Sequence, residues 1–464
     1  MLAVQILFFI IGVSFFLIFS IFLVIILRRF RRNMKYERFD IARNKFAPLV
    51  AALVSENNQT DINLLQKHND PIEWMAIEEL LLKTFEVSSP DVRKRLLPYF
   101  EKLGYVDDYI HTIKHGNKWR RALAAEKLGR LRWHKATPWL IELLNDKSRD
   151  VRNMAVHSLG LIRDQDAIPH IIASIKRAVG SHEDISLRIA KSSLICYGEV
   201  IIPFLIPELK NPIWQVRAVA VEILGETANT AMIQSITDML KDPEPDIRAK
   251  AAKVLGKIGD SSSVQPLLQI IEDPVWIIRL HAVRALGLIG NTDAIEKLKG
   301  RLMDSNWQVR RAAAEAISVM GDYAIPVWSG ILLNSADKYA KEQVLEELQR
   351  TGVIDGWVNF SLINEKGNIN DEIEMLLYVI GVIGGLSPLL RGMNSENPLI
   401  RQRIAKILGR IGNSRAINVL EHVVRQDNNP VVREEAVKAI KALHETSQPV
   451  SQISSDRQEV DRHG

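Results

Sequence analysis

The sequence predicts an all-α fold in which one N-terminal transmembrane helix precedes a solenoid of about twelve helical hairpins. Three observations support this prediction. Residues 1–27 carry no charged side chain, a motif recurs every 31 residues in the clearest part of the chain, and aromatic residues make up only 6% of the composition. Ala, Leu, Ile, Arg and Glu recur at short intervals, which is typical of helices packed on helices. A chain of 464 residues is also too long for one ordinary core, and no Pro-, Gly- or Ser-rich break divides it.

The predicted transmembrane helix is the segment 1–27, which reads MLAVQILFFIIGVSFFLIFSIFLVIIL. As a helix it reaches about 40 Å, which exceeds the roughly 30 Å hydrocarbon core of a bilayer. A secretory signal peptide is the alternative. That reading requires a basic n-region, a shorter apolar run and a small-residue cleavage site, none of which this segment has. We therefore expect a tilted membrane span.

A basic juxtamembrane segment, residues 28–45, follows the apolar run. It holds eight Lys or Arg residues against two acids, a net charge of +6, so residues 46–464 sum to −1. The positive charge therefore belongs to this collar, with Arg28, Arg29, Arg31, Arg32 and Lys35 at its start, and it does not predict a nucleic-acid partner. The positive-inside rule places the N-terminus outside and the repeats in the cytoplasm. Anionic lipid head groups are the expected membrane partner of the collar.

The repeat is clearest in three consecutive blocks spaced by 31 residues: IRAKAAKVLGKIGD (247–260), IRLHAVRALGLIGN (278–291) and VRRAAAEAISVMGD (309–322). Apolar positions three or four apart, such as Ala251, Leu255 and Ile258, predict one buried helix face. The two glycines of the Leu-Gly-x-Ile-Gly step are expected to end that helix. A shorter helix precedes each block. Each unit is therefore a helical hairpin, and the solenoid is expected over residues 72–443.

A basic residue recurs seven positions before the Leu or Ile of the Leu-Gly step, and we name these residues the ladder. They are Arg121, Arg152, Arg217, Arg248, Arg279, Arg310, Lys341, Arg401 and Arg433. An acid or amide stands six positions before most of them, at Asp146, Asn211, Asp242, Asp273, Asp304 and Asp427. We expect these side chains to cap the following helix, and each ladder arginine to reach the Asp of the neighbouring repeat. Repeated pairing of this kind fixes the stacking register, whereas a ligand-binding basic groove is the alternative.

The pattern VR-x-x-A-x-x-x-LG-x-IGD resembles the bacterial HEAT repeats first noted in phycobilisome lyases, over roughly residues 72–443. The resemblance implies a right-handed α-solenoid of HEAT-type hairpins, and partner proteins bound along the groove lined by the second helices. It is informative about the fold and says little about function. Combined with the apolar segment, it suggests a single-pass protein of a bacterial inner (plasma) membrane.

Three tryptophans, Trp214, Trp276 and Trp307, each stand three positions before a ladder arginine. Because they share one repeat position, we expect them along one edge of the solenoid. They either pack between repeats or anchor a bound partner, since aromatic side chains dominate interface energetics. They are the candidate partner-binding edge.

The resemblance also raises enzyme alternatives. Deoxyhypusine hydroxylase shares the HEAT-type fold and holds two irons on His-Glu pairs at equivalent repeat positions, whereas the only such pairs here, His182-Glu183 and His444-Glu445, are not equivalent. A bilin lyase-like enzyme is a further alternative, although such lyases lack a membrane anchor. No nucleotide-binding, zinc-protease or hydrolase motif occurs, and the single Cys196 excludes a disulfide framework. We expect no enzyme activity, catalytic residue, metal site or cofactor.

The remaining segments connect or interrupt the repeats. Residues 46–71 are expected to form a helical connector or cap, residues 352–372 a loop or bend in the stack, and residues 444–464 a disordered tail. The uncharged stretch 375–390 is either a buried repeat helix or a second membrane-embedded element. The functional expectation is a membrane-anchored scaffold or adaptor that assists an envelope enzyme such as a glycosyltransferase, with a lipid-dependent signalling adaptor as an alternative.

Overall fold

The computed structural model describes residues 2–54, 65, 70–180, 184–362 and 371–447. Within these ranges it describes side chains from Phe15 onward, except at positions 322, 360, 361, 446 and 447. All regular elements in the described ranges are helices, which confirms the predicted all-α class. The chain divides into two compact units, residues 1–227 and 228–464.

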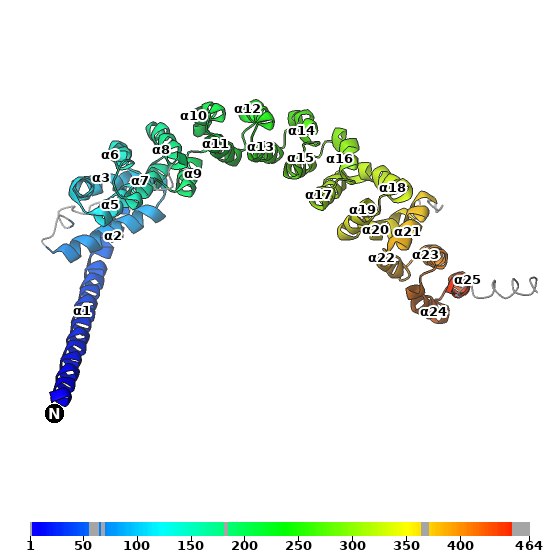
Figure 1. The fold of residues 1–464 in the computed structure, drawn as a ribbon, viewed down its shortest axis with the longest axis horizontal. Coiled ribbons are helices and arrows are strands. Elements are labelled where there is room, and N and C mark those ends of the chain that lie inside the picture. The colour runs from blue at the N-terminus through cyan, green and yellow to red at the C-terminus, as the bar shows by residue number, and fades with distance from the viewer. Residues whose placement is uncertain (1, 55–64, 66–69, 181–183, 363–370, 448–464) are drawn as a thin grey trace, which may run out of the picture. The chain divides into compact units, whose positions relative to one another are not determined.

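The first unit holds a long N-terminal helix followed by helical hairpins (Figure 1). Its α-helices are α1 (Leu2–Val54), α2 (Pro71–Val87), α3 (Pro90–Lys102), α4 (Tyr105–His115), α5 (Lys118–Arg130), α6 (Thr137–Leu143), α7 (Arg149–Ile162), α8 (Ile168–Gly180), α9 (Leu187–Ile195), α10 (Ile202–Leu205) and α11 (Trp214–Thr227).

The second unit continues the hairpin pattern. Its α-helices are α12 (Ile233–Asp238), α13 (Pro245–Ile258), α14 (Val264–Ile270), α15 (Trp276–Ile289), α16 (Ile295–Arg301), α17 (Trp307–Ser318), α18 (Ile325–Asn334), α19 (Lys338–Thr351), α20 (Val353–Gly356), α21 (Asp371–Ile383), α22 (Leu386–Gly392), α23 (Pro398–Ile411), α24 (Ile417–Gln426) and α25 (Pro430–Ser447). Figure 1 shows α13, α15 and α17 side by side in one layer, with α12, α14 and α16 in the other.

The two glycines of each repeat have different roles, and the prediction that both end the helix is wrong. Gly290 ends α15 in the left-handed conformation, with φ at +69°. Gly287 lies inside that helix, where an added Cβ would come within 2.7 Å of the Ala316 Cβ on α17. Gly256 faces Ala285 in the same way. The first glycine therefore lets neighbouring repeats approach closely, and only the second provides the helix end.

The N-terminal helix α1 runs without a break from the apolar segment through the collar to Val54. Residue 1, the side chains of residues 2–14, and residues 55–64 and 66–69 of the predicted connector lie outside the described part of the chain. From Phe15 to Leu27 every side chain is exposed. Ion pairs of 2.8 Å from Arg38 to Asp70 and from Lys45 to Glu73 fasten the end of α1 beside α2.

In the described part of the chain, no single helix is both long enough and apolar enough to cross a membrane. One bent pair of helical segments, Leu187–Ile195 with Gly198–Lys210 at 119°, qualifies by length and composition alone.

Two other predictions differ in part from the structure, and for the stretch 375–390 the structure agrees with one of the two alternatives. Residues 353–361 are helical rather than a loop, since α20 is followed by a π-helix over Trp357–Ser361 whose Trp357 side chain is buried. The uncharged stretch 375–390 belongs to α21 and α22, with Leu376, Ile380 and Leu389 completely buried, so it forms a repeat hairpin. Helix α25 extends to Ser447, past the predicted boundary at 444, because Leu443 is buried against the stack. Residues 363–370 and 448–464 lie outside the described chain.

Candidate functional site

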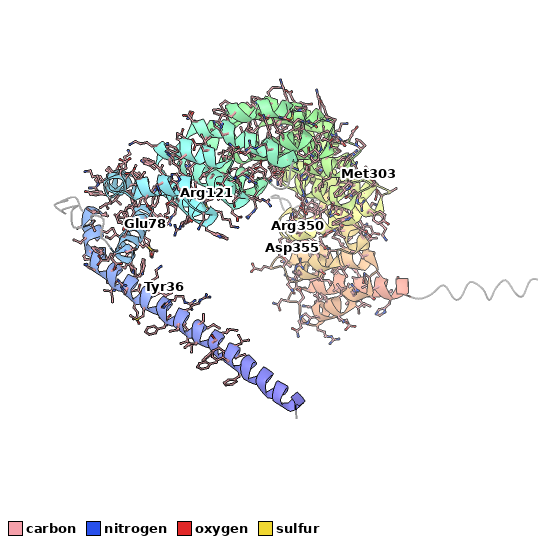
Figure 2. The ribbon with its side chains drawn as sticks, turned by 60° about the vertical axis from the view of Figure 1, so that its left-hand side comes forward. Tyr36, Glu78, Arg121, Met303, Arg350 and Asp355 are labelled. Carbon is pink, nitrogen blue, oxygen red and sulfur yellow. The ribbon has the colours of Figure 1, made fainter. Side chains whose placement is uncertain are left out.

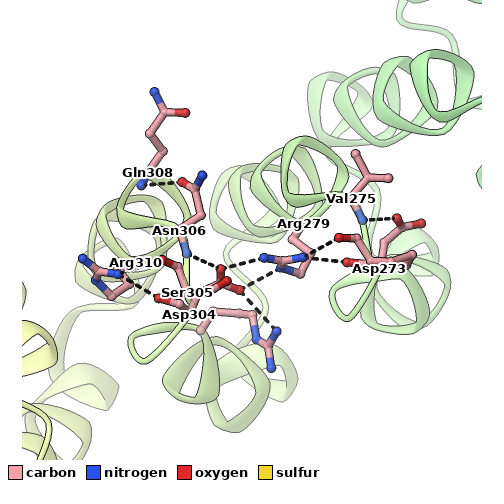
Figure 3. Close-up of polar contacts among 10 residues, drawn as sticks. Asp273, Val275, Arg279, Asp304, Ser305, Asn306, Gln308 and Arg310 are labelled. Carbon is pink, nitrogen blue, oxygen red and sulfur yellow. Dashed lines mark hydrogen bonds and ion pairs between the residues drawn. The ribbon is translucent and has the colours of Figure 1, made fainter.

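In most regular repeats the ladder is built on one aspartate, as Asp304 illustrates (Figure 3). Its Oδ1 atom accepts a hydrogen bond from the Asn306 backbone N–H at 2.9 Å. Its carboxylate also accepts two bonds of 2.8 Å from the Nε and Nη2 atoms of Arg279, which lies in the preceding repeat. The backbone carbonyl of Asp304 accepts a hydrogen bond of 2.8 Å from Arg310 Nη1. One aspartate thus joins its own turn, the arginine of its own repeat and the arginine of the repeat before it.

The same two-bond pairing recurs in both units, with donor–acceptor distances from 2.7 to 3.3 Å. The pairs are Arg121–Asp146, Arg248–Asp273 and Arg401–Asp427. Arg217 and Arg433 each donate to the backbone carbonyl six residues earlier, on Asn211 and Asp427 respectively.

Among the remaining ladder positions, Lys341 has no guanidinium to form a two-bond pair, and Arg152 and Arg310 have other partners. Arg152 forms an ion pair of 3.0 Å with Asp184 in the irregular repeat. Arg310 has Ser335 where an aspartate would continue the series, and its guanidinium lies over the Tyr339 ring at 5.3 Å. The expected helix capping by these aspartates is also wrong in detail. The carboxylate of Asp304 closes the turn before the helix, and the N-cap of α17 is Asn306, which accepts from the Gln308 N–H at 2.9 Å.

Electrostatics keep these pairs ionised. Burial raises the pKa of Asp304, but the hydrogen bonds from Arg279 and Asn306 and the charge of Arg279 outweigh it, so the pKa lies below its ordinary value. The pKa values of Asp146 and Asp427 are lowered by corresponding partners. Arg279 and Asp304 are only 9% and 6% exposed. The paired side chains of Arg121, Arg248 and Arg401 are 15 to 21% exposed, and each, like Arg279, is bonded to the aspartate of the next repeat, so the pairs join consecutive repeats.

The tryptophans lie at the first positions of second helices. Trp276 begins α15, Trp307 begins α17, and Trp214 begins α11 in the first unit. The side chains of Trp276 and Trp307 are 39% and 56% exposed, although both sit beside buried ladder residues. Since α15 and α17 pack side by side, these two indoles occupy one edge of the second unit.

A cleft of about 590 Å³ lies between α1, α2 and α5 in the first unit. Figure 2 marks two of its walls with Tyr36 on α1 and Glu78 on α2. Its lining combines basic, acidic and apolar side chains: Arg32, Lys35, Tyr36, Phe39, Met75, Glu78, Glu79, Leu82, Leu123, Lys127 and Arg130. The collar residues Arg32 and Lys35 therefore face a defined cavity, which was not predicted from the sequence.

A buried polar network supports the cleft wall. Glu78, which is 7% exposed, accepts hydrogen bonds from Lys127 Nζ at 2.7 Å and from the Tyr109 hydroxyl. Burial raises the pKa of Tyr109, and the Glu78 charge raises it further, so the phenol stays neutral and its O–H donates the hydrogen bond to Glu78. Nearby, Trp74 stacks on Tyr105 at 3.8 Å. Both Trp74–Tyr105 and Glu78–Tyr109 are 31 residues apart, and this repeat spacing was the available sequence signal for the network.

Other residues considered for chemistry do not assemble into a site. Among the described residues, no group of three or more His, Cys, Asp or Glu side chains is placed to hold a metal ion. The Cys196 thiol donates to the Ser192 carbonyl at 3.3 Å. His444 is exposed on α25, and His182-Glu183 lies outside the described residues.

The chain matches the family of HEAT repeats over residues 106–181, 202–279, 264–349 and 377–441. No curated protein matches it. Similar solved structures include human deoxyhypusine hydroxylase in complex with glycerol, at 15% identity and a TM-score of 0.24, covering 60% of this chain and 97% of that one. Kap121p bound to Nup53p is 16% identical with a TM-score of 0.44, covering 88% and 51%.

The complex of CpcE and CpcF of phycocyanin lyase from Nostoc is 21% identical with a TM-score of 0.23, covering 52% of this chain and 94% of that one. At these values the likenesses carry no argument about function.

Proposed function

Because the chain belongs to the HEAT-repeat family, a fold typical of protein-binding scaffolds, we propose that it is a membrane-anchored cytoplasmic scaffold without catalytic activity of its own. The observation that carries the proposal is the pair of half-exposed indoles, Trp276 and Trp307, at one position of consecutive repeats. The ladder pair Arg279–Asp304 fixes the spacing of those repeats. The edge is therefore preorganised, so a partner binds it without an entropic cost of ordering the repeats.

The anchoring part of the proposal rests on the N-terminal segment. Residues 1–27 are uncharged and are followed at once by Arg28, Arg29, Arg31 and Arg32. Exposed apolar side chains from Phe15 to Leu27 have no protein surface covering them in the described chain, and a bilayer would cover them. We propose an N-terminus outside, repeats in the cytoplasm of a bacterium, and lipid head groups around the collar.

Anchoring determines which partners the edge meets. A scaffold confined to a membrane raises the effective concentration of any partner in the same membrane without a new contact. The partner class we propose is therefore a membrane enzyme of the cell envelope, such as a glycosyltransferase.

The test is affinity capture from gently solubilised membranes with the tagged full-length chain and with W214A/W276A/W307A, after circular dichroism shows that the variant is folded. Loss of a specific partner only in the variant supports the tryptophan edge. Equal recovery of that partner by both proteins contradicts it, and turnover of a small molecule by the purified chain contradicts the scaffold.

A further inference from the structure

We propose that the cleft between α1, α2 and α5 is a binding site for one anionic lipid of the adjoining leaflet, with the lipid phosphate at Arg32 and Lys35 and its apolar part on the cleft floor. This inference rests on the proposed anchoring of α1 and adds a small-molecule ligand to it. It is independent of the tryptophan edge.

The charge in the cleft is not balanced by the protein. Most of its charged side chains are already paired within 2.5 to 2.8 Å, as Lys127–Glu78, Arg130–Glu86 and Lys83–Glu79. In the described part of the chain, Arg32 and Lys35 have no carboxylate at ion-pair distance, and both line the cavity from the same helix as Tyr36. Two positive charges therefore remain for an anion, and a phosphate oxygen accepts from both lysine and arginine.

The floor of the cleft is apolar and would bind an apolar group of the ligand. Phe39, Met75, Leu82 and Leu123 line it, and Met75 and Leu123 remain 44% and 48% exposed. A free phosphate would leave these side chains in water. The volume of about 590 Å³ is of the size that holds one small ligand, whereas a partner helix of roughly 10 Å diameter requires an extended groove. An amphiphile satisfies both halves of the site.

The position of the cleft along α1 favours a lipid as the source. Arg32 lies five residues beyond Leu27, which is about 7.5 Å along an α-helix. The head-group layer extends roughly 5 to 8 Å beyond the hydrocarbon on each side. Arg32 therefore reaches the phosphate level when the apolar run spans the bilayer. Phe39 on the floor lies seven residues beyond Arg32, so an acyl chain on the floor has left the bilayer, and its apolar contacts with the floor offset the bilayer contacts that it loses.

The experiment uses the full chain in phosphatidylcholine vesicles that contain a phosphatidic acid with a photoactivatable diazirine in its acyl chain. Cross-linked peptides are mapped by mass spectrometry, and the same diazirine on phosphatidylcholine gives the neutral-lipid arm. We expect phosphatidic acid to label residues 75–82 and 123, the neutral lipid to label them at least tenfold less, and soluble glycerol 3-phosphate in excess not to compete.

Two variants with the same loss of charge separate the site from the collar. R32Q/K35Q removes the two bases in the cleft, and R29Q/R31Q removes two bases outside it. The phosphatidic acid fraction needed for half-maximal labelling is expected to rise about 30-fold in the first variant and to change much less in the second. L123E is expected to abolish floor labelling, while L288E, at an exposed position in the second unit, leaves it intact.

Three results would overturn the proposal: equal labelling by the two lipids, equal loss in both double variants, or full competition by glycerol 3-phosphate. Labelling of residues 1–27 by either lipid reports membrane insertion separately. Labelling confined to residues 1–27 therefore refutes the cleft site alone, and no labelling anywhere refutes the anchoring on which it rests.

Discussion

Substitution of Arg279 by alanine tests whether the ladder holds the repeats together. The change removes two bonds of 2.8 Å to the Asp304 carboxylate, together with bonds to the carbonyls of Asp273 and Pro274. It leaves the Asp304 carboxylate, whose side chain is only 2% exposed, without its two shortest charged hydrogen bonds. Breaking a buried pair in this way costs about 3 to 5 kcal/mol, and we take the lower end because Asp304 keeps the Asn306 amide and Arg301 as partners.

The second unit also supplies a matched control. Lys297 and Glu272 form an ion pair at 2.8 Å, with the same separation of 25 residues as Arg279 and Asp304. Their side chains are 55% and 57% exposed, so solvent screens the pair and K297A is expected to change stability little. The two variants thus compare pairs of equal length and equal sequence separation that differ in burial.

Hydrogen exchange is the appropriate assay for this pair, because a repeat array opens locally and amide exchange reports the opening of individual helices. In the full-length chain, R279A is expected to accelerate exchange of the protected amides of α15 and α17 by roughly 100-fold, following a local loss of about 3 kcal/mol. R279A/D304A is expected to exchange more slowly than the sum of the single effects predicts, because the two side chains share the interaction. Equal exchange in R279A and K297A would refute the structural role of the ladder.

Three further predictions concern packing, pH and the cleft wall. G287A places a methyl group against Ala316 and is expected to lower the free energy of unfolding by about 1 to 3 kcal/mol. In the control G300A the added methyl group meets no atom within 4 Å, so this variant is expected to be neutral or slightly stabilising. Thermal unfolding compares the two variants, and equal melting temperatures would contradict the close approach at Gly287. The pKa values of Asp146, Asp304 and Asp427 are lowered in the folded chain. Their contribution to stability is therefore full above about pH 4 and is lost as the pH falls below that value. Circular dichroism between about pH 7 and pH 2.5 measures this loss, and undiminished stability throughout that range would contradict the prediction. Y109F removes a hydrogen-bond donor to the buried Glu78 carboxylate and is expected to lower the free energy of unfolding of the first unit by roughly 1.5 to 3 kcal/mol, measured by thermal unfolding. An unchanged transition would show that Lys127 alone satisfies this carboxylate.

The repeat architecture was largely predictable, because local periodicity produces it. The apolar face of α13, its left-handed end at Gly259 and the 31-residue spacing can all be read from one block and its copies. The tertiary role of Gly256 could not be predicted in this way. A glycine is needed at this position because Ala285 of the next helix packs closely against it. In the sequence, a glycine that ends a helix and a glycine that allows close packing look alike.

The cleft could not be predicted from the sequence for a related reason. Its walls come from α1, α2 and α5, and neither charge patterning nor helical periodicity states which face of α1 meets α2. The paired aromatic and acidic residues Trp74, Glu78, Tyr105 and Tyr109 repeat the spacing of 31 residues, but their first members stand in a degenerate repeat without the Leu-Gly step. A count of charges treats the collar as uniform, whereas Arg32 and Lys35 line a cavity and the neighbouring bases Arg29 and Arg31 do not.

Site-specific photo-crosslinking in intact membranes tests the central claim most directly. A benzophenone amino acid is placed singly at Trp276 or Trp307, and at Leu288 or Val319 as controls. Each control lies twelve residues after its tryptophan, about 18 Å away, Leu288 within α15 and Val319 at the C-cap of α17, and they are more exposed at 71% and 68%. A scaffold that binds its partner on the tryptophan edge gives one common adduct from both tryptophan positions and none from the controls. Equal adducts from all four positions, or none from the tryptophan positions, would contradict the account.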